Sequence, residues 1–280
     1  MGRAKLLPMP SLALQRLRLP QSRFPPIAFE EGAFAAAVPT PSWPFRVVSW
    51  NIYLGRRYAA VDDLFARHAG LVGADVVALQ EVARRHDRGE ASQARRLAFR
   101  HRLNYVYAPA HRCGLRLERG QAILTSHPIE RSWTIPLPRV RHRRIALAAD
   151  IRVGSELLRV INVHLENRGR LSPFILRQRA AQILHVLRDL RHEPPARTVL
   201  MGDFNTLGHI VDRGRSELLP ALLAAEGYAD AHGGRKAITH RPFRARLDWI
   251  FSKDLPALAG DVINSGWISD HLPVWADLRR

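Results

Sequence analysis

The chain has little cysteine and no long apolar run. Cys113 is the one cysteine among its 280 residues, which excludes an intramolecular disulfide and a metal cage of thiolates. No segment reaches the roughly 20 apolar residues that a transmembrane helix needs. Near the start, Arg16 and Arg18 interrupt what would be the apolar core of a signal peptide. We therefore expect a cytoplasmic protein, with a secreted or a peripheral membrane protein as the alternatives.

Lysine is scarce, although the chain is strongly basic. Lysine and arginine together number 43 against 25 acidic residues, for a net charge of +18, and nearly all of the excess is arginine. Arginine suits bidentate contacts with phosphate, so the composition favours a polyanionic partner such as nucleic acid or an anionic membrane surface. A GC-rich genome produces the same arginine- and alanine-rich composition, so the charge alone leaves both explanations open.

Prolines interrupt the first part of the chain. Because proline removes a backbone donor and breaks periodic structure, residues 1–45 are predicted to form an extended or disordered leader. The folded domain is then expected to span residues 46–280. The prolines concerned are Pro8, Pro10, Pro20, Pro25, Pro26, Pro39, Pro41 and Pro44.

Strand and helix patterns alternate after the leader. Apolar and β-branched runs predict strands at 46–50, 75–80, 105–108, 121–125, 145–153, 157–164, 198–202, 246–251 and 272–277. Amphipathic patterns predict helices at 58–72, 92–103, 172–191 and 217–226. The turn signal at 153–156 indicates antiparallel pairing. The pattern predicts an α/β (α+β) fold of two mostly antiparallel sheets with helices outside.

Short polar motifs stand at the ends of these apolar runs. Asparagine, histidine and acidic residues are poor strand formers, so their repeated placement at strand ends needs a reason. A single polar site where several strands terminate supplies one. The motifs are Trp50-Asn51, Gln80-Glu81, Asn162-Val163-His164, Gly202-Asp203-Phe204-Asn205, Leu247-Asp248-Trp249 and Ser269-Asp270-His271.

The carboxylates in these motifs indicate a metal ion. Ionised carboxylates repel one another, and burying one without a partner costs on the order of several kcal/mol. A hard divalent cation removes that cost, and an oxygen-rich set without cysteine favours Mg²⁺, or Mn²⁺, over Zn²⁺. Asn51 and Asn205 add amide groups that bind a metal or donate to a phosphoryl oxygen. The acidic residues are Glu81, Asp203, Asp248 and Asp270.

Two histidines complete the candidate site. His164 ends an apolar strand and His271 directly follows Asp270, and either one is suited to protonate a leaving group or to activate water. Asp248 interrupts an apolar strand, so it is a candidate to orient a histidine and raise its basicity. Each motif taken alone has a simpler explanation, such as a surface histidine or an ordinary turn. Their joint occurrence favours the single site.

Taken together, the motifs resemble the endonuclease/exonuclease/phosphatase superfamily. It includes DNase I-like nucleases, abasic-site endonucleases, neutral sphingomyelinases and inositol polyphosphate phosphatases. The resemblance covers residues 46–280 and includes Gly120–Ile129, which begins Gly-Gln where the family usually has Gly-Asn. It implies a four-layer α/β sandwich and Mg²⁺-dependent cleavage of a phosphoester.

The resemblance also implies roles around a metal and a phosphoryl group. Glu81 corresponds to the principal metal ligand, and Asn51 and Asp270 to residues close to the ion. Asp203 corresponds to the residue that orients or deprotonates the attacking water, and Asn205 to one that binds the scissile phosphate.

Histidine roles follow from the same resemblance. His271, oriented by Asp248, is expected to stabilise the transition state or to transfer a proton. His164 matches a histidine of the DNase I and sphingomyelinase branches, and Glu118 is a further candidate to orient it.

The substrate stays open, because family membership does not determine it. Arginine groups at 84–85, 139–144 and 168–170 favour a nuclease acting on DNA or RNA, with Arg143 and Arg144 as substrate contacts. The alternatives are a sphingomyelinase-like phospholipid phosphodiesterase, an inositol or sugar phosphate phosphatase, and an inactive binding module. In the lipid alternative, residues 133–137 touch lipid, or else they belong to the core. The intact set of polar residues argues against an inactive module, and we expect a monomer.

Overall fold

Two β-sheets form the centre of the protein. The computed structural model describes residues 29–138, 142–167, 173–206 and 218–280. The first sheet contains β1 (Glu30–Gly32), β2 (Phe45–Asn51), β3 (Val76–Arg85), β4 (Asn104–Cys113), β5 (Leu117–Thr125), β12 (Ala257–Val262) and β13 (Val274–Leu278). The second contains β6 (Ile129–Pro136), β7 (Ile145–Val153), β8 (Glu156–His164), β9 (Arg197–Asp203), β10 (Ala229–Asp230) and β11 (Asp248–Lys253).

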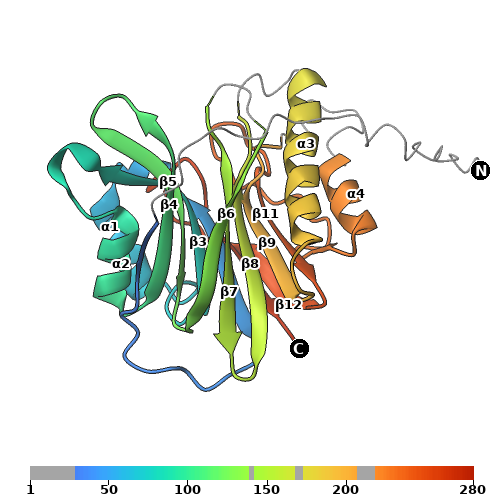
Figure 1. Ribbon diagram of the computed structural model, residues 1–280, viewed down its shortest axis with the longest axis horizontal. Helices are drawn as coiled ribbons and strands as arrows, with labels where there is room; N and C mark the ends of the chain where they lie inside the picture. The colour runs from blue at the N-terminus through green and yellow to red at the C-terminus, as the bar shows by residue number, and fades with distance from the viewer. Residues whose placement is uncertain (1–28, 139–141, 168–172, 207–217) are drawn as a thin grey trace, which may run out of the picture.

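Helices cover the outer faces of the sheets. The α-helices are α1 (Tyr58–Arg67), α2 (Gln93–His101), α3 (Pro173–Leu190) and α4 (Leu218–Ala225), and the short 3-10 helices are Tyr53–Gly55 and His86–Arg88. In Figure 1, α1 and α2 lie on one side of the paired sheets and α3 and α4 on the other. None of the helices in the described segments is long and apolar enough to cross a membrane.

Three apolar layers hold these elements together, as expected for a four-layer sandwich. The layer between the sheets includes Val47 and Val76 from the first sheet and Val160 and Val199 from the second. Because successive strand residues point to opposite faces, Val48 beside Val47 packs outward, in the layer under α1 and α2. The third layer packs the second sheet against α3 and α4. The predicted fold class is therefore confirmed.

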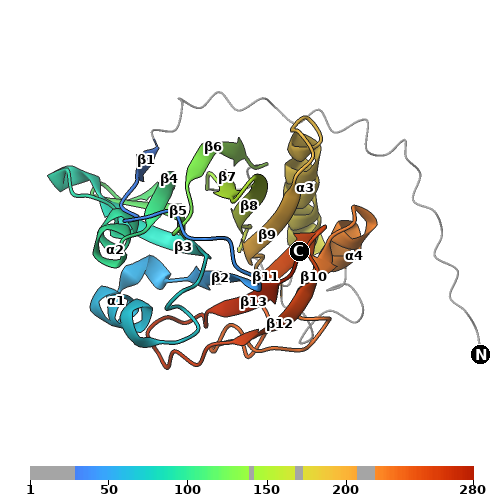
Figure 2. The ribbon, with the colours of Figure 1, turned by 90° about the horizontal axis from the view of Figure 1, so that it is seen from below.

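Most strand pairs are antiparallel, and two pairs are parallel. The first sheet has the order β1-β4-β5-β3-β2-β13-β12, and the second β10-β11-β9-β8-β7-β6. β2 pairs parallel with β3, and β8 pairs parallel with β9. Figure 2 shows β2 and β13 of the first sheet next to β9 and β11 of the second. Parallel partners end at the same edge of a sheet, so β8 and β9 end together. The last residue of β2, Asn51, contacts the last residue of β9, Asp203, so the end of β2 lies at the same end of the sandwich.

A buried amide joins the two sheets. Asn162 of β8 is fully buried, and its Nδ2 donates to the carbonyl oxygens of Leu79 and Ala122 in the first sheet, both at 2.9 Å. Its Oδ1 accepts from Nε2 of Gln80 at 2.8 Å. A second link comes from Gln121, whose Nε2 donates to the carbonyl oxygen of Ile145 at 2.8 Å. Gln121, where the family usually has asparagine, thus reaches the facing sheet.

The folded region begins earlier than the prolines predicted. Within the expected leader, β1 pairs antiparallel with β4, and the ring of Phe34 stacks on Tyr105 with centroids 5.8 Å apart. Glu30 accepts a hydrogen bond from Oγ of Ser92 at 2.7 Å. The boundary at residue 46 is therefore too late, because apolar and acidic anchors between the prolines bind this segment to the sheet. Residues 1–28 lie outside the described part of the chain.

Four strands were not predicted, and they are the four sheet edges: β1, β6, β10 and β12. An edge strand is short or carries polar residues on its open side, so it lacks the apolar run of a central strand. β4 is longer than predicted and continues through Pro109 to Cys113. The proline fits because the register with β5 shifts between Pro109 and His111.

We predict that Asn162→Ala destabilises the protein strongly. The substitution leaves the carbonyl oxygens of Leu79 and Ala122 and the amide of Gln80 buried without their partner, at about 1–3 kcal/mol for each unsatisfied group. Thermal or urea unfolding should show a loss of at least about 3 kcal/mol. Asn264→Ala, at an exposed loop asparagine, is the control. A loss of the same small size in both variants would contradict the role of the amide.

Candidate active site

Three adjacent strands of the second sheet place a histidine and two aspartates in one row. β8 and β9 run parallel with His164 opposite Asp203, and β9 and β11 run antiparallel with Asp203 opposite Asp248. All three side chains are at least nine-tenths buried. The predicted convergence of strand ends is thus present in this sheet.

The first sheet adds residues from the ends of β2 and β13. Nδ2 of Asn51 donates to Oδ2 of Asp203 at 3.1 Å, across the gap between the sheets. The indole of Trp50 donates to the carbonyl oxygen of His271 at 3.1 Å, and Oγ of Ser269 donates to that of Asn51 at 2.7 Å. These hydrogen bonds hold the segment before β13 against the last residues of β2.

His271 lies between two buried aspartates. Its Nδ1 is 2.8 Å from Oδ2 of Asp248, and its Nε2 is 3.7 Å from Oδ2 of Asp203. Burial lowers the pKa of His271, but the charges of Asp248 and Asp203 outweigh it and raise the pKa to about 10. Oγ1 of Thr239 donates to the same Oδ2 of Asp248 at 2.7 Å. The imidazole is therefore held as a cation.

The β9 exit around Asp203 is strained in a way that glycine and asparagine tolerate. Gly202 has φ of 145°, and a Cβ there would lie 2.0 Å from the carbonyl oxygen of Val163, so only glycine fits. Asn205 has φ of 54°, a left-handed conformation, and its backbone N–H donates to Oδ1 of Asp203 at 2.9 Å. Burial raises the pKa of Asp203. Nδ2 of Asn205 donates to the carbonyl oxygen of Leu165 at 3.1 Å.

Glu81 sits on a bulge in β3. The pairing with β5 shifts between Gln80 and Val82, and Glu81 between them has φ of 55°. Such a bulge re-aims one side chain out of the regular ladder. Oε1 of Glu81 lies 3.0 Å from Nη1 of Arg119 and 3.9 Å from Nε2 of His164.

His164 connects Glu81 to Asp203. Its Nε2 lies 3.5 Å from Oδ2 of Asp203. Burial and the charges of Arg144 and Arg119 hold the pKa of His164 well below its usual range, so this imidazole is neutral. Glu118, the further candidate to orient it, instead accepts from Nε and Nη2 of Arg84 at 2.9 and 2.6 Å. That expectation is wrong, because Glu118 pairs with an arginine of the neighbouring strand.

Asp270 is the most exposed member of the set, with 27% of its side chain accessible. Its Oδ2 lies 3.7 Å from Nε2 of His240, whose ring meets that of His271 edge-on with centroids 4.6 Å apart. Burial alone raises the pKa of Asp270, but His240 and His271 bring it below its usual range.

The arginine segment borders the carboxylates through Arg144. Arg144 is 2% exposed, and its Nε and Nη2 have no hydrogen-bond partner among the described residues. Burial and the charge of Arg119 lower its pKa to about 10, whereas Glu166, Glu81 and Asp203 act to raise it. Arg143 is partly buried, which lowers its pKa. Residues 139–141 and 168–170 of the predicted arginine groups lie outside the described residues.

The motifs did not include three residues of this site. They are Arg119, His111 and His240. Arg119 contacts Glu81, and its Nη2 lies 2.9 Å from Nε2 of His111. His240 lies between Asp270 and His271. Arginine and histidine in such positions look like surface residues in a sequence. The one available signal was the place of Arg119 directly before Gly120-Gln121.

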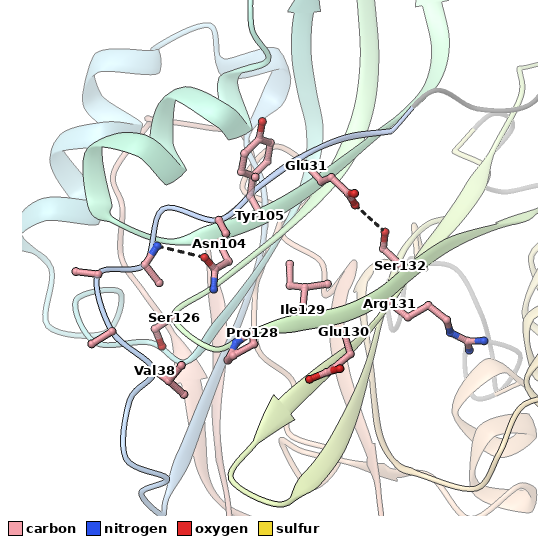
Figure 3. A pocket seen from close by; sticks show the side chains of 15 residues that line it. Glu31, Val38, Asn104, Tyr105, Ser126, Pro128, Ile129, Glu130, Arg131 and Ser132 are labelled. Carbon is pink, nitrogen blue, oxygen red and sulfur yellow. Dashed lines mark hydrogen bonds between the residues drawn. The ribbon is translucent and has the colours of Figure 1, made fainter.

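A cavity in the described part of the chain lies away from the polar cluster. A cavity of about 730 Å³ is lined by residues around β1, the start of β4 and β6, including Asn104 and Ser126 (Figure 3). β5 runs antiparallel to β3 and pairs Thr125 with Val76, so the end of β5 lies at the start of β3. Glu81 lies toward the other end of β3. The cavity is thus remote from the polar cluster.

The polar cluster fits a divalent cation. Two groups of three have ligand atoms within 4.8 Å of one another among the described residues: Asp203, Asp248 and His271, and His240, Asp270 and His271. Because His271, which belongs to both, is held as a cation, the carboxylates are the groups available to a metal. Buried atoms without a hydrogen-bond partner in the described structure include Nε2 of His164 and Oδ1 of Asn205. Buried polar atoms without a hydrogen-bond partner, next to clustered carboxylates, indicate that this site binds an ion or a polar ligand. Glu81 is in neither group and pairs with Arg119 instead.

Comparisons with known proteins find a matching family model and similar folds. The model of the Endonuclease/Exonuclease/phosphatase family matches residues 48–271. No curated protein has a significantly similar sequence. Among solved structures, an endonuclease/exonuclease/phosphatase family protein from Leptotrichia buccalis C-1013-b superposes with a TM-score of 0.68 at 20% identity, covering 84% of this chain and 100% of that one.

Two further structures were solved with DNA products. The 3′ phosphatase NExo from Neisseria, bound to a product DNA hairpin, has a TM-score of 0.63 at 22% identity and covers 84% of this chain and 100% of its own. TDP2 from D. rerio, complexed with a single-strand DNA product, has a TM-score of 0.65 at 20% identity and covers 84% and 99%. At these identities the likeness shows the fold.

We predict that Asp248→Asn lowers the pKa of His271, because an amide carries no charge. NMR titration of the metal-free proteins should give about 10 for the wild type and a much lower value for the variant. Because the folded-state pKa of His271 is raised above 6.5, its protonation contributes fully to the free energy of unfolding below pH 6.5, and this contribution disappears as the pH rises through about 10. The difference in free energy of unfolding between wild type and Asp248→Asn should therefore become smaller between pH 6.5 and about 10. An unchanged pKa in the variant would contradict the pairing.

Proposed function

Because this chain belongs to the endonuclease/exonuclease/phosphatase family, a family of phosphoester hydrolases, we propose that it is a metal-dependent phosphodiesterase that cleaves DNA or RNA. The observation that carries the proposal is the buried line Asp248–His271–Asp203, with Asn51 and His164 in contact with its last member. It holds a histidine cation and a carboxylate side by side at the strand ends. The carboxylate suits activation of the attacking water, and the cation suits stabilisation of the charge that develops on the phosphoryl oxygens.

The chain's own residues divide the work. Asp203, buried and with a raised pKa, accepts the proton of the attacking water and fixes its direction. His271, held as a cation by Asp248, donates a hydrogen bond to a phosphoryl oxygen as negative charge develops. Neutral His164 offers Nε2 to the same space. The surroundings of the two histidines thus give them opposite protonation states: His271 is a cation that donates, and His164 is a neutral ring.

Phosphate binding is assigned to arginine more than to Asn205. The partnerless atom of Asn205 is its Oδ1, an acceptor, whereas a phosphoryl oxygen needs donors. Arg144 presents two buried donors, Nε and Nη2, within the electrostatic reach of Asp203. Burying N–H donors without acceptors is costly, and a phosphate would supply the acceptors for these two. Asn205 is then placed to accept from the attacking water.

A divalent cation, Mg²⁺ or Mn²⁺, would be held by Glu81, Asn51 and Asp270. Bound there, it would polarise a phosphoryl oxygen and lower the pKa of water. Arg119 lies 3.0 Å from the Glu81 carboxylate and supplies a positive charge to it.

The lipid alternative loses its specific support. Ile135 and Leu137 are 1% and 6% exposed and belong to the core under α3, and Trp133 packs against the same core. Residues 133–137 therefore do not form an exposed lipid-contacting surface. The net charge of +18 and the buried Arg144 favour a polyanionic, phosphate-rich substrate.

We predict Mg²⁺-dependent cleavage of plasmid DNA or single-stranded RNA by the purified protein, abolished by EDTA and restored by Mg²⁺ or Mn²⁺. Asp203→Ala and His271→Ala should lower turnover by at least about a hundredfold, since removing one preorganised donor costs about 3–4 kcal/mol in the barrier. Both variants should retain the wild-type circular dichroism spectrum.

His185→Ala, at a half-buried histidine on α3, is the matched control and should keep wild-type activity. Sphingomyelin vesicles and inositol phosphates complete the substrate panel. Cleavage of either one in the absence of nucleic acid cleavage would overturn the substrate class. Full activity in a folded Asp203→Ala protein would overturn the mechanism.

We predict that Arg119→Gln strengthens metal binding by about tenfold, because a cation 3.0 Å from Glu81 competes with a divalent ion for the same carboxylate. Electron paramagnetic resonance of bound Mn²⁺ measures the affinity without turnover. Arg112→Gln, at a side chain that is 72% exposed, should leave it unchanged. Equal affinity in all three proteins would argue against Glu81 as a ligand.

A further inference from the structure

Two aromatic–arginine pairs stand at the rim of the active site. The guanidinium of Arg241 lies over the ring of Trp267, 5.4 Å from its centroid, and that of Arg56 lies over Tyr53 at 4.2 Å. Trp267 is 59% exposed, and Tyr53 is partly buried. Neither aromatic residue is part of the three apolar layers. Packing of the core therefore does not account for them.

Both pairs are tied directly to residues of the site. The backbone N–H of Tyr53 donates to Oδ1 of Asn51 at 3.0 Å. The backbone N–H of Arg241 donates to the carbonyl oxygen of Asp270 at 3.0 Å. Asn51 and Asp270 also belong to segments that are joined through Ser269. The two pairs thus lie on the side of the reaction centre where the metal is expected.

The arginines of these pairs differ from most other arginines that lie over aromatic rings in the described segments. Arg46, Arg84 and Arg131 also lie over rings, but each forms an ion pair with a carboxylate. Arg96, over Tyr58 between α1 and α2, is the exception. Within the described segments, neither Arg56 nor Arg241 forms such an ion pair. Arg241 donates instead to Oδ1 of Asn264 at 2.5 Å. Their charge is thus not neutralised by a neighbouring acidic residue.

A surface that alternates aromatic rings with arginine matches one class of ligand. Unpaired bases stack on aromatic rings, and the phosphates between them bind guanidinium groups. In a duplex the bases are already stacked on one another and their faces are covered. Resting on the proposed function, we propose that Trp267, Arg241, Tyr53 and Arg56 bind single-stranded nucleic acid, so that the enzyme prefers unpaired strands or ends. Bases stack on Trp267 and Tyr53, and the backbone follows the two arginines.

The test compares a short oligothymidylate with an abasic oligomer of the same length and backbone, both by fluorescence anisotropy in EDTA on the full chain. Removal of one stacking platform should weaken binding about tenfold. Trp267→Ala should therefore bind the oligothymidylate about tenfold more weakly than the wild type does. The abasic oligomer should bind the variant and the wild type with equal affinity. Trp267→Phe should recover most of the loss, which also guards against a folding defect.

Phe99→Ala is the matched control, because Phe99 is 71% exposed on α2 and its ring packs edge-on against Phe34, outside the two aromatic–arginine pairs. Wild-type affinity of Trp267→Ala for the oligothymidylate, or an equal loss on both oligomers, would overturn the stacking role. Tighter binding of the wild type to a duplex than to the single strand would overturn the preference. If the wild type still cleaves nucleic acid with Mg²⁺, the proposed function survives that failure. If it neither binds nor cleaves any nucleic acid, both fail.

Discussion

The burial of Asp203 between the two sheets is the constraint on which the site depends. A carboxylate that is 1% exposed is stable only with partners around it, and these come from both sheets. Asn51 reaches it from the first sheet, His164 from the neighbouring strand of the second, and His271 from the segment before β13. Each partner is held by a further bond. The sandwich and the reaction centre are therefore stabilised by the same contacts.

Irregular backbone is concentrated where the chemistry is placed. Glu81 and Asn205 both adopt left-handed conformations, and Gly202 lets β9 approach β8 more closely than any side chain would allow. Such conformations cost free energy and persist only when the surroundings hold them. Here the surroundings are regular strands on either side, linked across the sandwich by Asn162 and Gln121. Regular strands and the hydrogen bonds between the sheets thus hold the strained backbone of the site in place.

Much of the fold was predictable from local patterns, and the parts that were missed share a physical cause. Central strands such as β3 and β9 carry continuous apolar runs because both of their faces are covered, so their sequences identify them. β6 and β12 lie at sheet edges with one side open. Polar residues conceal the alternation in β6, and β12 consists mostly of small, exposed residues that are not typical of a strand. β1 was missed because prolines surround it, although its anchors Glu30 and Phe34 lie between them.

The sequence by itself determined the residue types of the reaction centre and their place at strand ends, because acidic, amide and histidine residues recur together at the ends of several apolar runs, where each is a poor strand former. The pairing of Asp248 with His271 was expected from the family resemblance, and the structure has it. Only the tertiary structure decided the other pairs: it placed Arg119 on Glu81 and gave Glu118 to Arg84 instead of His164. These partners lie on separate strands, and their distances depend on how two sheets stack. No local pattern encodes that stacking, so ion pairs and pKa values emerged only from the folded chain.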